Sequence, residues 1–400
     1  MLGLFQNGDP KREETGNTGI LAATSIHAGE QSICVGELLR KGCAFSQLLK
    51  DAGCKEGDLF CTVMDKSIDF LISILGINMA GGVVLPVDLD CTIDRFQTIF
   101  NESRAKWMIA DEHAHSFINS GILARRSLNL GWMGSRDNLP NGMFPEFIRE
   151  NLDDYPLSSV VRKINPAGFS SVFFKYCKNG MLDAYLLSNR EISEFVNKAM
   201  EMIHVGSDDR IAGFFPGHIM PFVLEVGMSA RINSAVHLYR PSLLKNTEIF
   251  LETVRESEAT LLLCRSDDLR NLGDSGEKTS PKNNSVRQIL IWGDPPSRSK
   301  IDLLKELFPN CGIQNFYMVS GREEPERDAT PANVCRARLD AKCKMETVYI
   351  LCREFFSFAF GNAEGLPTIR EVHHAHWKKR TITTGMMNSR SEMDNKSKSG

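Results

Sequence analysis

The sequence predicts an α/β fold in which parallel sheets are covered by helices. Strand-like and helix-like segments alternate from residue 35 to residue 110, and again from about residue 166 to residue 317. Hydrophobic residues make up 42% and charged residues 24% of the chain, close to the average of soluble globular proteins. Because alternating strands and helices are typical of parallel sheets, we predict two tandem α/β units.

The first block contains three strands and three helices. Apolar residues recur with a period near 3.6 over residues 35–52, which predicts a helix, and Gly53 closes it as a residue that tolerates the left-handed conformation. Short apolar runs predict buried strands, and amphipathic or apolar stretches between them predict helices. We expect strands at 59–64, 83–87 and 107–110, and further helices at 68–79 and 93–100.

The second block has the same pattern over a greater length. Residues 119–160, with Pro140, Pro145 and Pro156, read as an irregular connection to it, and 274–285 as an exposed loop. Residues 347–352 and 355–360 are apolar enough for two further strands. We expect strands at 169–174, 211–215, 235–239, 259–264, 286–292 and 313–317, and helices at 190–203, 223–233, 243–255 and 297–307.

Five segments follow from this pattern. We predict a flexible N-terminus (1–30), a first α/β subdomain (31–160), a second α/β subdomain (161–325), a divergent segment (326–380) and a disordered tail (381–400). The tail prediction rests on the abundance of Thr, Ser, Asn and Lys after residue 380.

Composition excludes several classes of protein. The net charge of −3 gives no bias toward nucleic acid or anionic membranes. No apolar run reaches the ~18 residues that span a bilayer, and residues 1–19 are too polar for a signal peptide, so we expect a cytoplasmic protein. The 11 cysteines form no Cys-x-x-Cys pair, which argues against a zinc site and a disulfide framework.

One series of residues carries a family resemblance. Gly57-Asp58, then Ala80-Gly81-Gly82, then Pro86-Val87-Asp88 and Asp94-Arg95 resemble the opening of the adenylate-forming superfamily, although any βαβ unit offers a plainer explanation. That superfamily includes acyl-CoA synthetases, luciferases and peptide-synthetase adenylation domains. The resemblance implies the fold of their large N-terminal domain. It also implies their reaction, in which ATP and magnesium activate a carboxylic acid as an acyl-adenylate.

The phosphate loop of that family is altered here. The matching positions include Lys175, Lys178, Asn179 and Gly180, of which Gly180 keeps its family identity, and Asp183 stands where the family has lysine. One wrong-sign charge ~4 Å from a phosphate costs about 4 kcal/mol at a dielectric constant near 20, or roughly a thousandfold in affinity. Asn179-Gly180 also predicts a simple hairpin turn, whereas the two lysines favour weak anion binding, and both interpretations stay open.

Two more motifs resemble the nucleotide site of the family. Gly293-Asp294 follows a strand as the family's Gly-Glu does beside the adenine pocket, although such a turn is common. Asn315, Tyr317 and Ser320 match an Asn-x-Tyr-Gly-x-Thr-Glu motif, where the tyrosine stacks on adenine and the hydroxyl contacts phosphate. Gly321 replaces the glutamate that helps to hold magnesium.

The substrate pocket is less clearly marked. Counting back from Glu225, which matches a family glutamate, places Met220 where amino-acid-activating members have an aspartate for the substrate amine. His218 is a second pocket candidate, although a lone histidine is more often structural. Residues 326–400 match neither the ribose-binding aspartate nor the mobile lysine of the family, and the histidines at 373–376 read as a polar stretch.

Three functions remain open. We favour a catalytically impaired, non-catalytic relative that binds an acyl group, a nucleotide or a protein partner. The alternatives are a truncated or variant product of a longer acid–thiol ligase or aminoacyl-activating enzyme, such as a beta-alanine-activating type, and an active ligase with weak ATP binding. ATP and magnesium are the family's cofactors, and we expect their binding here to be weak or absent.

Overall fold

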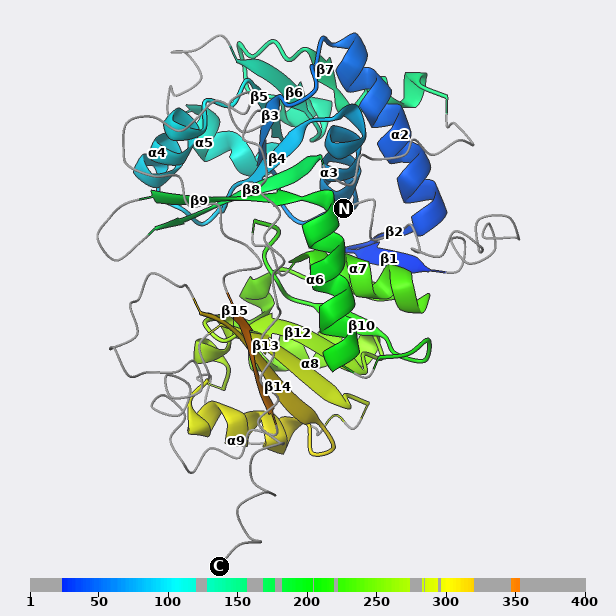
Figure 1. Cartoon of the computed structure of the whole chain (residues 1–400), viewed down its shortest axis with the longest axis vertical. Coiled ribbons are helices and arrows are strands. Elements are labelled where there is room, and N and C mark those ends of the chain that lie inside the picture. The colour runs from blue at the N-terminus through cyan, green and yellow to red at the C-terminus, as the bar shows by residue number, and fades with distance from the viewer. Residues whose placement is uncertain are drawn as a thin grey trace, which may run out of the picture.

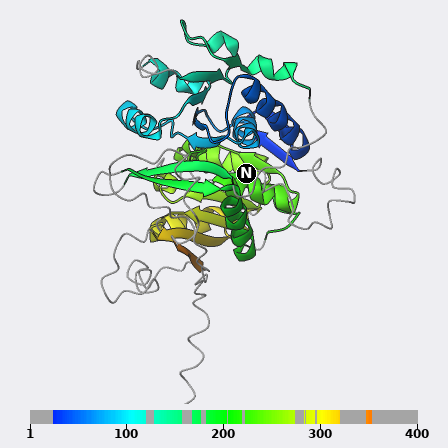
Figure 2. The same cartoon turned by 45° about the horizontal axis from the view of Figure 1, so that its top comes forward.

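Two sheets lie one beyond the other along the long axis of the molecule (Figure 1). The computed structural model describes residues 24–119, 128–156, 168–176, 182–203, 205–218, 222–273, 283, 285–293, 296–319 and 347–352. Turning the molecule keeps the two sheets distinct, with the β8–β9 pair on the side of the first sheet that lies toward the second (Figure 2). The predicted α/β class with two parallel-rich units is confirmed.

The first sheet has seven strands in the order β7-β6-β5-β3-β4-β8-β9. Neighbouring strands are parallel except β8 and β9, which are antiparallel. Its strands are β3 (Leu59–Val63), β4 (Val83–Pro86), β5 (Trp107–Ala110), β6 (Asn129–Trp132), β7 (Phe147–Ile148), β8 (Phe169–Tyr176) and β9 (Leu182–Ser188).

The second sheet has eight strands in the order β15-β14-β13-β12-β10-β11-β1-β2. Its strands are parallel except for the β1–β2 hairpin at one edge. They are β1 (Ser25–Ala28), β2 (Gln31–Cys34), β10 (Ile211–Gly213), β11 (Val236–Leu238), β12 (Leu261–Arg265), β13 (Gln288–Trp292), β14 (Gly312–Val319) and β15 (Thr347–Cys352).

Eight α-helices cover these sheets in the described part of the chain. Local capping sets several of their starts: Ser67, Thr92 and Asn246 each accept a hydrogen bond from the backbone N–H three residues further on. The helices are α2 (Val35–Asp51), α3 (Ile68–Ala80), α4 (Ile93–Ser103), α5 (His115–Asn119), α6 (Asn189–Met202), α7 (Phe222–Ile232), α8 (Thr247–Glu256) and α9 (Arg298–Leu307).

Several strands lie elsewhere than the sequence pattern suggested. The stretch 119–160 contains β6 and β7, which extend the first sheet, because its prolines fall in the loops between strands. β8 and β9 follow residue 161, yet they complete the first sheet through pairing of β8 with β4. β1 lies within the segment that we predicted as flexible and pairs with β11 of the second sheet.

One predicted helix is interrupted. Residues 243–255 were expected to form a single helix, but a short 3₁₀ helix (η6, Pro241–Lys245) precedes α8. The break falls at Asn246, whose side chain accepts a hydrogen bond from the Ile249 N–H and caps α8. The strand prediction at 347–352 is confirmed by β15, which is parallel to β14, whereas 355–360 lies outside the described residues.

One of three hydrophobic clusters among the described residues is shared by the two sheets. Its buried members come from α2 (Phe45), α3 (Phe70), β5 (Trp107), α7 (Phe222) and β13 (Leu290). α3 is buried along nearly its whole circumference, which explains why its sequence is apolar without a polar face. The core therefore fixes the two sheets relative to each other.

Close packing of α2 against α3 depends on Gly76. A Cβ atom at this position would lie 2.5 Å from Cδ1 of Phe45 and 3.0 Å from the Gly42 carbonyl oxygen. We expect Gly76→Ala to lower the free energy of unfolding by about 1–2 kcal/mol, because overpacking outweighs the ~1 kcal/mol gain in helix propensity. Urea denaturation measures the change. Gly206→Ala, where a Cβ would meet no atom within 4 Å, is the control and should be within ~0.5 kcal/mol of wild type.

Candidate functional site

Polar residues follow the carboxyl ends of strands in both sheets, and these ends meet. In the first sheet Asp111 comes directly after β5, and Asp65 and Asp88 come one residue further beyond the ends of β3 and β4. In the second sheet Phe215 and Arg240 come after β10 and β11. Hydrogen bonds and ion pairs join the two sets, and we call this region the sheet junction. Ligands of open α/β sheets bind beyond the carboxyl ends of the strands, so the sheet junction is the candidate site.

A buried ion pair forms the centre of the sheet junction. Nζ of Lys66, in the loop between β3 and α3, lies 3.0 Å from Oε2 of Glu225 on α7. The same nitrogen donates to the backbone carbonyls of Gly213 and Phe215, each at 2.9 Å. Glu225 accepts a further hydrogen bond from the Phe215 N–H at 2.6 Å. Both side chains are almost fully excluded from solvent, so each depends on the other for its charge balance.

Burial shifts the titration of both partners. Burial raises the pKa of Glu225 to about 7, although Lys66 and the Phe215 N–H favour its ionised form. Burial also lowers the pKa of Lys66, with Glu225 opposing the shift. The direction is the one that desolvation imposes on any buried charge, and it means that protonation of this pair is sensitive to pH near neutrality.

His218 follows Phe215 in the same loop and reaches the first sheet. Its Nδ1 is 3.5 Å from Oδ1 of Asp88, the residue that ends the Pro86-Val87-Asp88 motif. Burial lowers the pKa of His218, against the opposing effect of Asp88. The structure thus places this predicted pocket residue at the sheet junction, with a mostly buried imidazole whose neutral form is favoured by burial.

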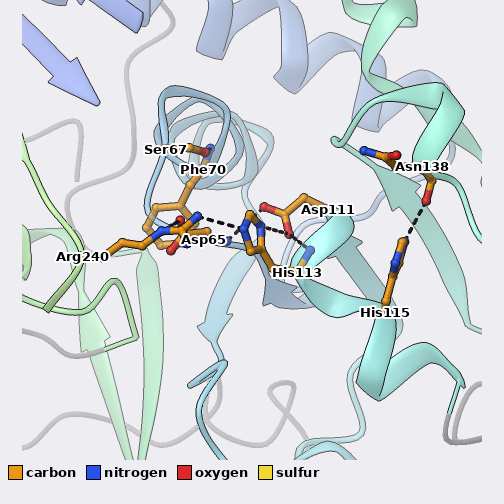
Figure 3. A network of polar contacts seen from close by, with 8 residues as sticks. All are labelled: Asp65, Ser67, Phe70, Asp111, His113, His115, Asn138 and Arg240. Atoms are coloured by element: carbon orange, nitrogen blue, oxygen red, sulfur yellow. Dashed lines mark hydrogen bonds and ion pairs between the residues drawn. The ribbon is translucent and has the colours of Figure 1, made fainter. Parts of the chain in front are cut away.

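A second network closes one side of the sheet junction (Figure 3). Nε of Arg240 lies 2.5 Å from Oδ2 of Asp65, and Nη2 lies 2.9 Å from Nε2 of His113. Asp111 accepts hydrogen bonds from the backbone N–H groups of Asp65 and His113, both at 3.0 Å. Because a guanidinium only donates, Nε2 of His113 is the acceptor and its Nδ1 carries the proton.

Figure 3 also shows how local structure fixes these residues. Ser67 caps α3 by accepting from the Phe70 N–H at 3.1 Å, and Asp65, which precedes this cap, accepts from Arg240. The ring of His115 contacts the Asn138 carbonyl oxygen at 2.7 Å and belongs to a separate contact within the first sheet.

Two of the predicted nucleotide-binding residues lie together at the end of β13. Asn315 is fully buried on β14, and its Nδ2 donates to the carbonyls of Ile291 and Gly293 at 3.1 and 3.0 Å. Its Oδ1 accepts no hydrogen bond from the described residues. Gly293 has a φ of +104°, and a Cβ there would meet no atom within 4 Å. This corner has an open face and a buried acceptor.

For the other predicted nucleotide-binding residues, the structure gives the strand position of two, and the rest lie outside the described residues. Tyr317 belongs to β14 and pairs in register with Ile350 of β15. Lys175 belongs to β8, where its Cα is in register with that of Asp183 on β9. β8 and β9 pair in antiparallel fashion, and the residues that join them lie outside the described part of the chain. Lys178, Asn179, Gly180, Met220, Asp294 and Ser320 lie outside the described residues.

A buried amide anchors the start of this hairpin. Asn78 on α3 donates from Nδ2 to the Ser170 carbonyl at 2.9 Å, and its Oδ1 accepts from the Ser170 hydroxyl at 2.8 Å. Both residues are buried. Reciprocal hydrogen bonds of this kind fix β8 on the first sheet and therefore fix where the hairpin leaves it.

Sequence reasoning missed most of the sheet junction. Lys66, Asp65, His113 and Arg240 were not singled out, although an aspartate follows each of three successive buried strands. That recurrence was the available signal. Nothing in the sequence links Lys66 to Glu225, which is 159 residues away. In the part of the chain that the structure describes, no three His, Cys, Asp or Glu side chains gather as a metal site would require.

No helix among the described residues combines the length and the apolar character that crossing a bilayer requires.

A family comparison places the first part of the chain among known proteins. The model of a family described as AMP-binding enzyme matches residues 14–131.

Curated relatives share modest identity with the chain. An L-proline–[L-prolyl-carrier protein] ligase of Streptomyces coelicolor is 22% identical over 303 residues, which are 74% of this chain and 56% of the ligase. Malpibaldin synthetase of Mortierella alpina is 31% identical over 128 residues, 32% of this chain and 2% of the synthetase. The chain thus spans little more than half of the first protein and a small part of the second.

Solved structures share the fold. The anthranilate CoA ligase AuaEII, solved in complex with anthranoyl-AMP, superposes with a TM-score of 0.64 at 13% identity. The superposition covers 74% of this chain and 58% of that ligase. At this identity the likeness concerns the fold alone. It agrees with the two-sheet arrangement described above.

Proposed function

Since the chain belongs to the adenylate-forming superfamily, we propose that it retains the acid-binding site of that superfamily but is impaired in the ATP-dependent step. The site is the sheet junction with His218, and its ligand is a carboxylic acid or an acyl group. Met220 stands where amino-acid-activating members have an aspartate, which supports an acid without an α-amine over an amino acid.

The charge balance of the sheet junction is the observation that carries this proposal. Three of its cations already contact carboxylates of the chain itself. Lys66 pairs with Glu225 and Arg240 pairs with Asp65. Arg265, at the end of β12, makes two hydrogen bonds to Asp268 at 2.7 and 2.8 Å. A triphosphate needs cations or backbone donors that are not already neutralised, so these three offer it little.

The structure suits the base of a nucleotide better than it suits the phosphates. The corner of Gly293 and Asn315 suits a base, because both residues belong to motifs that resemble the family's adenine pocket and a Cβ on Gly293 would meet no described atom within 4 Å. The phosphate side suits it poorly, since Asp183 on β9 introduces a carboxylate where the family has a lysine. When bound, ATP with magnesium would supply the adenylyl group that is transferred to the carboxylate, with pyrophosphate as the leaving group. Gly321 stands where the family has its magnesium-binding carboxylate.

Two measurements test the proposal directly. Thermal unfolding is followed with a panel of fatty acids and beta-alanine, and separately with magnesium-ATP. A ligand at 100 times its dissociation constant should stabilise the protein by about 2.7 kcal/mol. We expect this stabilisation with a carboxylic acid and not with millimolar ATP. ATP–pyrophosphate exchange should stay near background. Rapid exchange with any acid of the panel would disprove the impairment.

Restoring the lost charges should restore nucleotide binding. We expect Asp183→Lys combined with Gly321→Glu and magnesium to tighten ATP binding by at least about tenfold, because a repulsive charge becomes attractive. Calorimetric titration with magnesium-ATP measures it.

Asp154→Lys combined with Gly321→Glu is the matched control, because it makes the same net charge change with the lysine on an exposed residue of the 3₁₀ helix at Arg149–Asp154. It should leave the affinity within about twofold of wild type, because screened surface charges act weakly at a distance. Equal gains in both variants would show that net charge, rather than the phosphate loop, controls binding.

A further inference from the structure

The loop at residues 214–218 leads from β10 toward α7 and carries His218; we call it the His218 loop. Its first part is held from both sheets. Lys66 of the first sheet donates to the carbonyls of Gly213 and Phe215, and Glu225 of α7 accepts from the Phe215 N–H. We propose that Lys66 and Glu225 act together as positioning residues that set where His218 lies against Asp88.

Two glycines allow α7 and α3 to approach the His218 loop closely. A Cβ on Gly213 would lie 2.3 Å from Cδ of Glu225, so only glycine lets the carboxylate reach the strand end. A Cβ on Gly217 would lie 2.8 Å from Cε1 of Phe70, which presses the second half of the His218 loop against α3. The loop is thus clamped between α3 and α7 on either side of Phe215.

Lys66 occupies a position that no neutral side chain can copy. Its three ammonium donors meet two backbone carbonyls and one carboxylate, and its nitrogen lies 5.8 Å from the centre of the Phe222 ring. The carbonyls belong to the strand end from which the His218 loop departs. Removing the ammonium leaves these acceptors buried without their donor, so the loop must move or admit water.

An ion pair that only joined the two sheets would have no specific effect on the position of His218. Arg240 and Asp65 also join the two sheets, but they contact His113 and not the His218 loop. Arg240→Met is therefore a matched control: it removes an ion pair between the sheets and leaves the contacts of residues 214–218 in place. This positioning role rests on the proposed acid-binding function, because it concerns His218 of the same site. The experiment below needs no ligand.

The test compares His218 in four proteins. The double variant Lys66→Met/Glu225→Leu replaces the buried pair by apolar groups and is expected to fold, as such replacements often do. Modification of His218 by diethyl pyrocarbonate is followed by mass spectrometry, and its imidazole resonance by NMR. His218→Asn assigns the resonance, and Lys66→Arg tests rescue of the charge and donors.

We expect His218 in the double variant to react about tenfold faster than in wild type, the change expected from losing one hydrogen bond to a charged group. Its resonance should move toward that of a free imidazole. Lys66→Arg should stay closer to wild type than the double variant does, and Arg240→Met should leave His218 unchanged. An unchanged His218 in the double variant, or an equal change in Arg240→Met, overturns the proposal. Because the measurement uses no acid, failure of this proposal can be distinguished from failure of the proposed acid-binding function.

Discussion

Replacement of Lys66 by methionine is expected to lower the free energy of unfolding by about 3–5 kcal/mol. The ammonium is buried, and its removal leaves the Glu225 carboxylate without its cation 3.0 Å away. It also leaves the Gly213 and Phe215 carbonyls without their donor. An uncompensated buried charge is among the largest single effects that a substitution can have. Urea denaturation at pH 8, where Glu225 is mostly ionised, measures the loss.

A second substitution in the same ion pair serves as the control for this prediction. Adding Glu225→Leu to Lys66→Met removes the uncompensated carboxylate, so the double variant should regain most of the lost stability. The coupling energy from the four proteins of the double-mutant cycle should exceed ~2 kcal/mol in magnitude. Additive losses would show that Lys66 and Glu225 do not depend on each other. Arg240→Met, which removes a largely exposed partner, should cost no more than about 1 kcal/mol.

Stability is also expected to depend on pH through Glu225. Burial raises its pKa from 4.5 to about 7 in the folded protein. Between these two values the folded state holds a proton that the unfolded chain has released. The contribution of Glu225 to the free energy of unfolding therefore falls as pH rises from 4.5 to 7, and it is fully present below pH 4.5. The contribution of this one group is at most about 3 kcal/mol.

Glu225→Gln isolates this contribution from the other titrating groups. Burial lowers the pKa of His237 to about 4, with His27 adding to the shift, so His237 makes stability rise with pH over part of the same range. Because His237 is present in both proteins, the difference between wild type and Glu225→Gln reports on Glu225. We expect wild type to lose about 3 kcal/mol relative to the variant between pH 4.5 and pH 7.5. Parallel stability curves would show that Glu225 stays ionised throughout.

The two predictions bear on function through the His218 loop. The pair that stabilises the junction of the two sheets also holds the strand end from which this loop leaves. A change in protonation of Glu225 near neutral pH would act on the contacts of Phe215 first. The proposed acid-binding site and the stability of the sheet junction are therefore linked by the same few hydrogen bonds.

Much of the fold follows from local patterns. Helices such as α2 and α6 and strands such as β3 and β5 lie within a few residues of the predicted ranges, because periodicity, caps and glycines are encoded in neighbouring residues. The motifs at Gly293 and Asn315 also indicated a common corner, and the structure brings these two residues within 3.0 Å of each other. Glu225 was recognised only as a reference point for counting.

What the sequence by itself determined is thus the order of elements, the fold class and the resemblance to a family. Tertiary structure alone decided that β8 and β9 join the first sheet, that β1 joins the second, and that Lys66 meets Glu225 across 159 residues. The physical reason is one of range. Helix and strand patterns arise from contacts within a few residues, whereas strand order and buried charge pairs depend on which surfaces meet when the core closes.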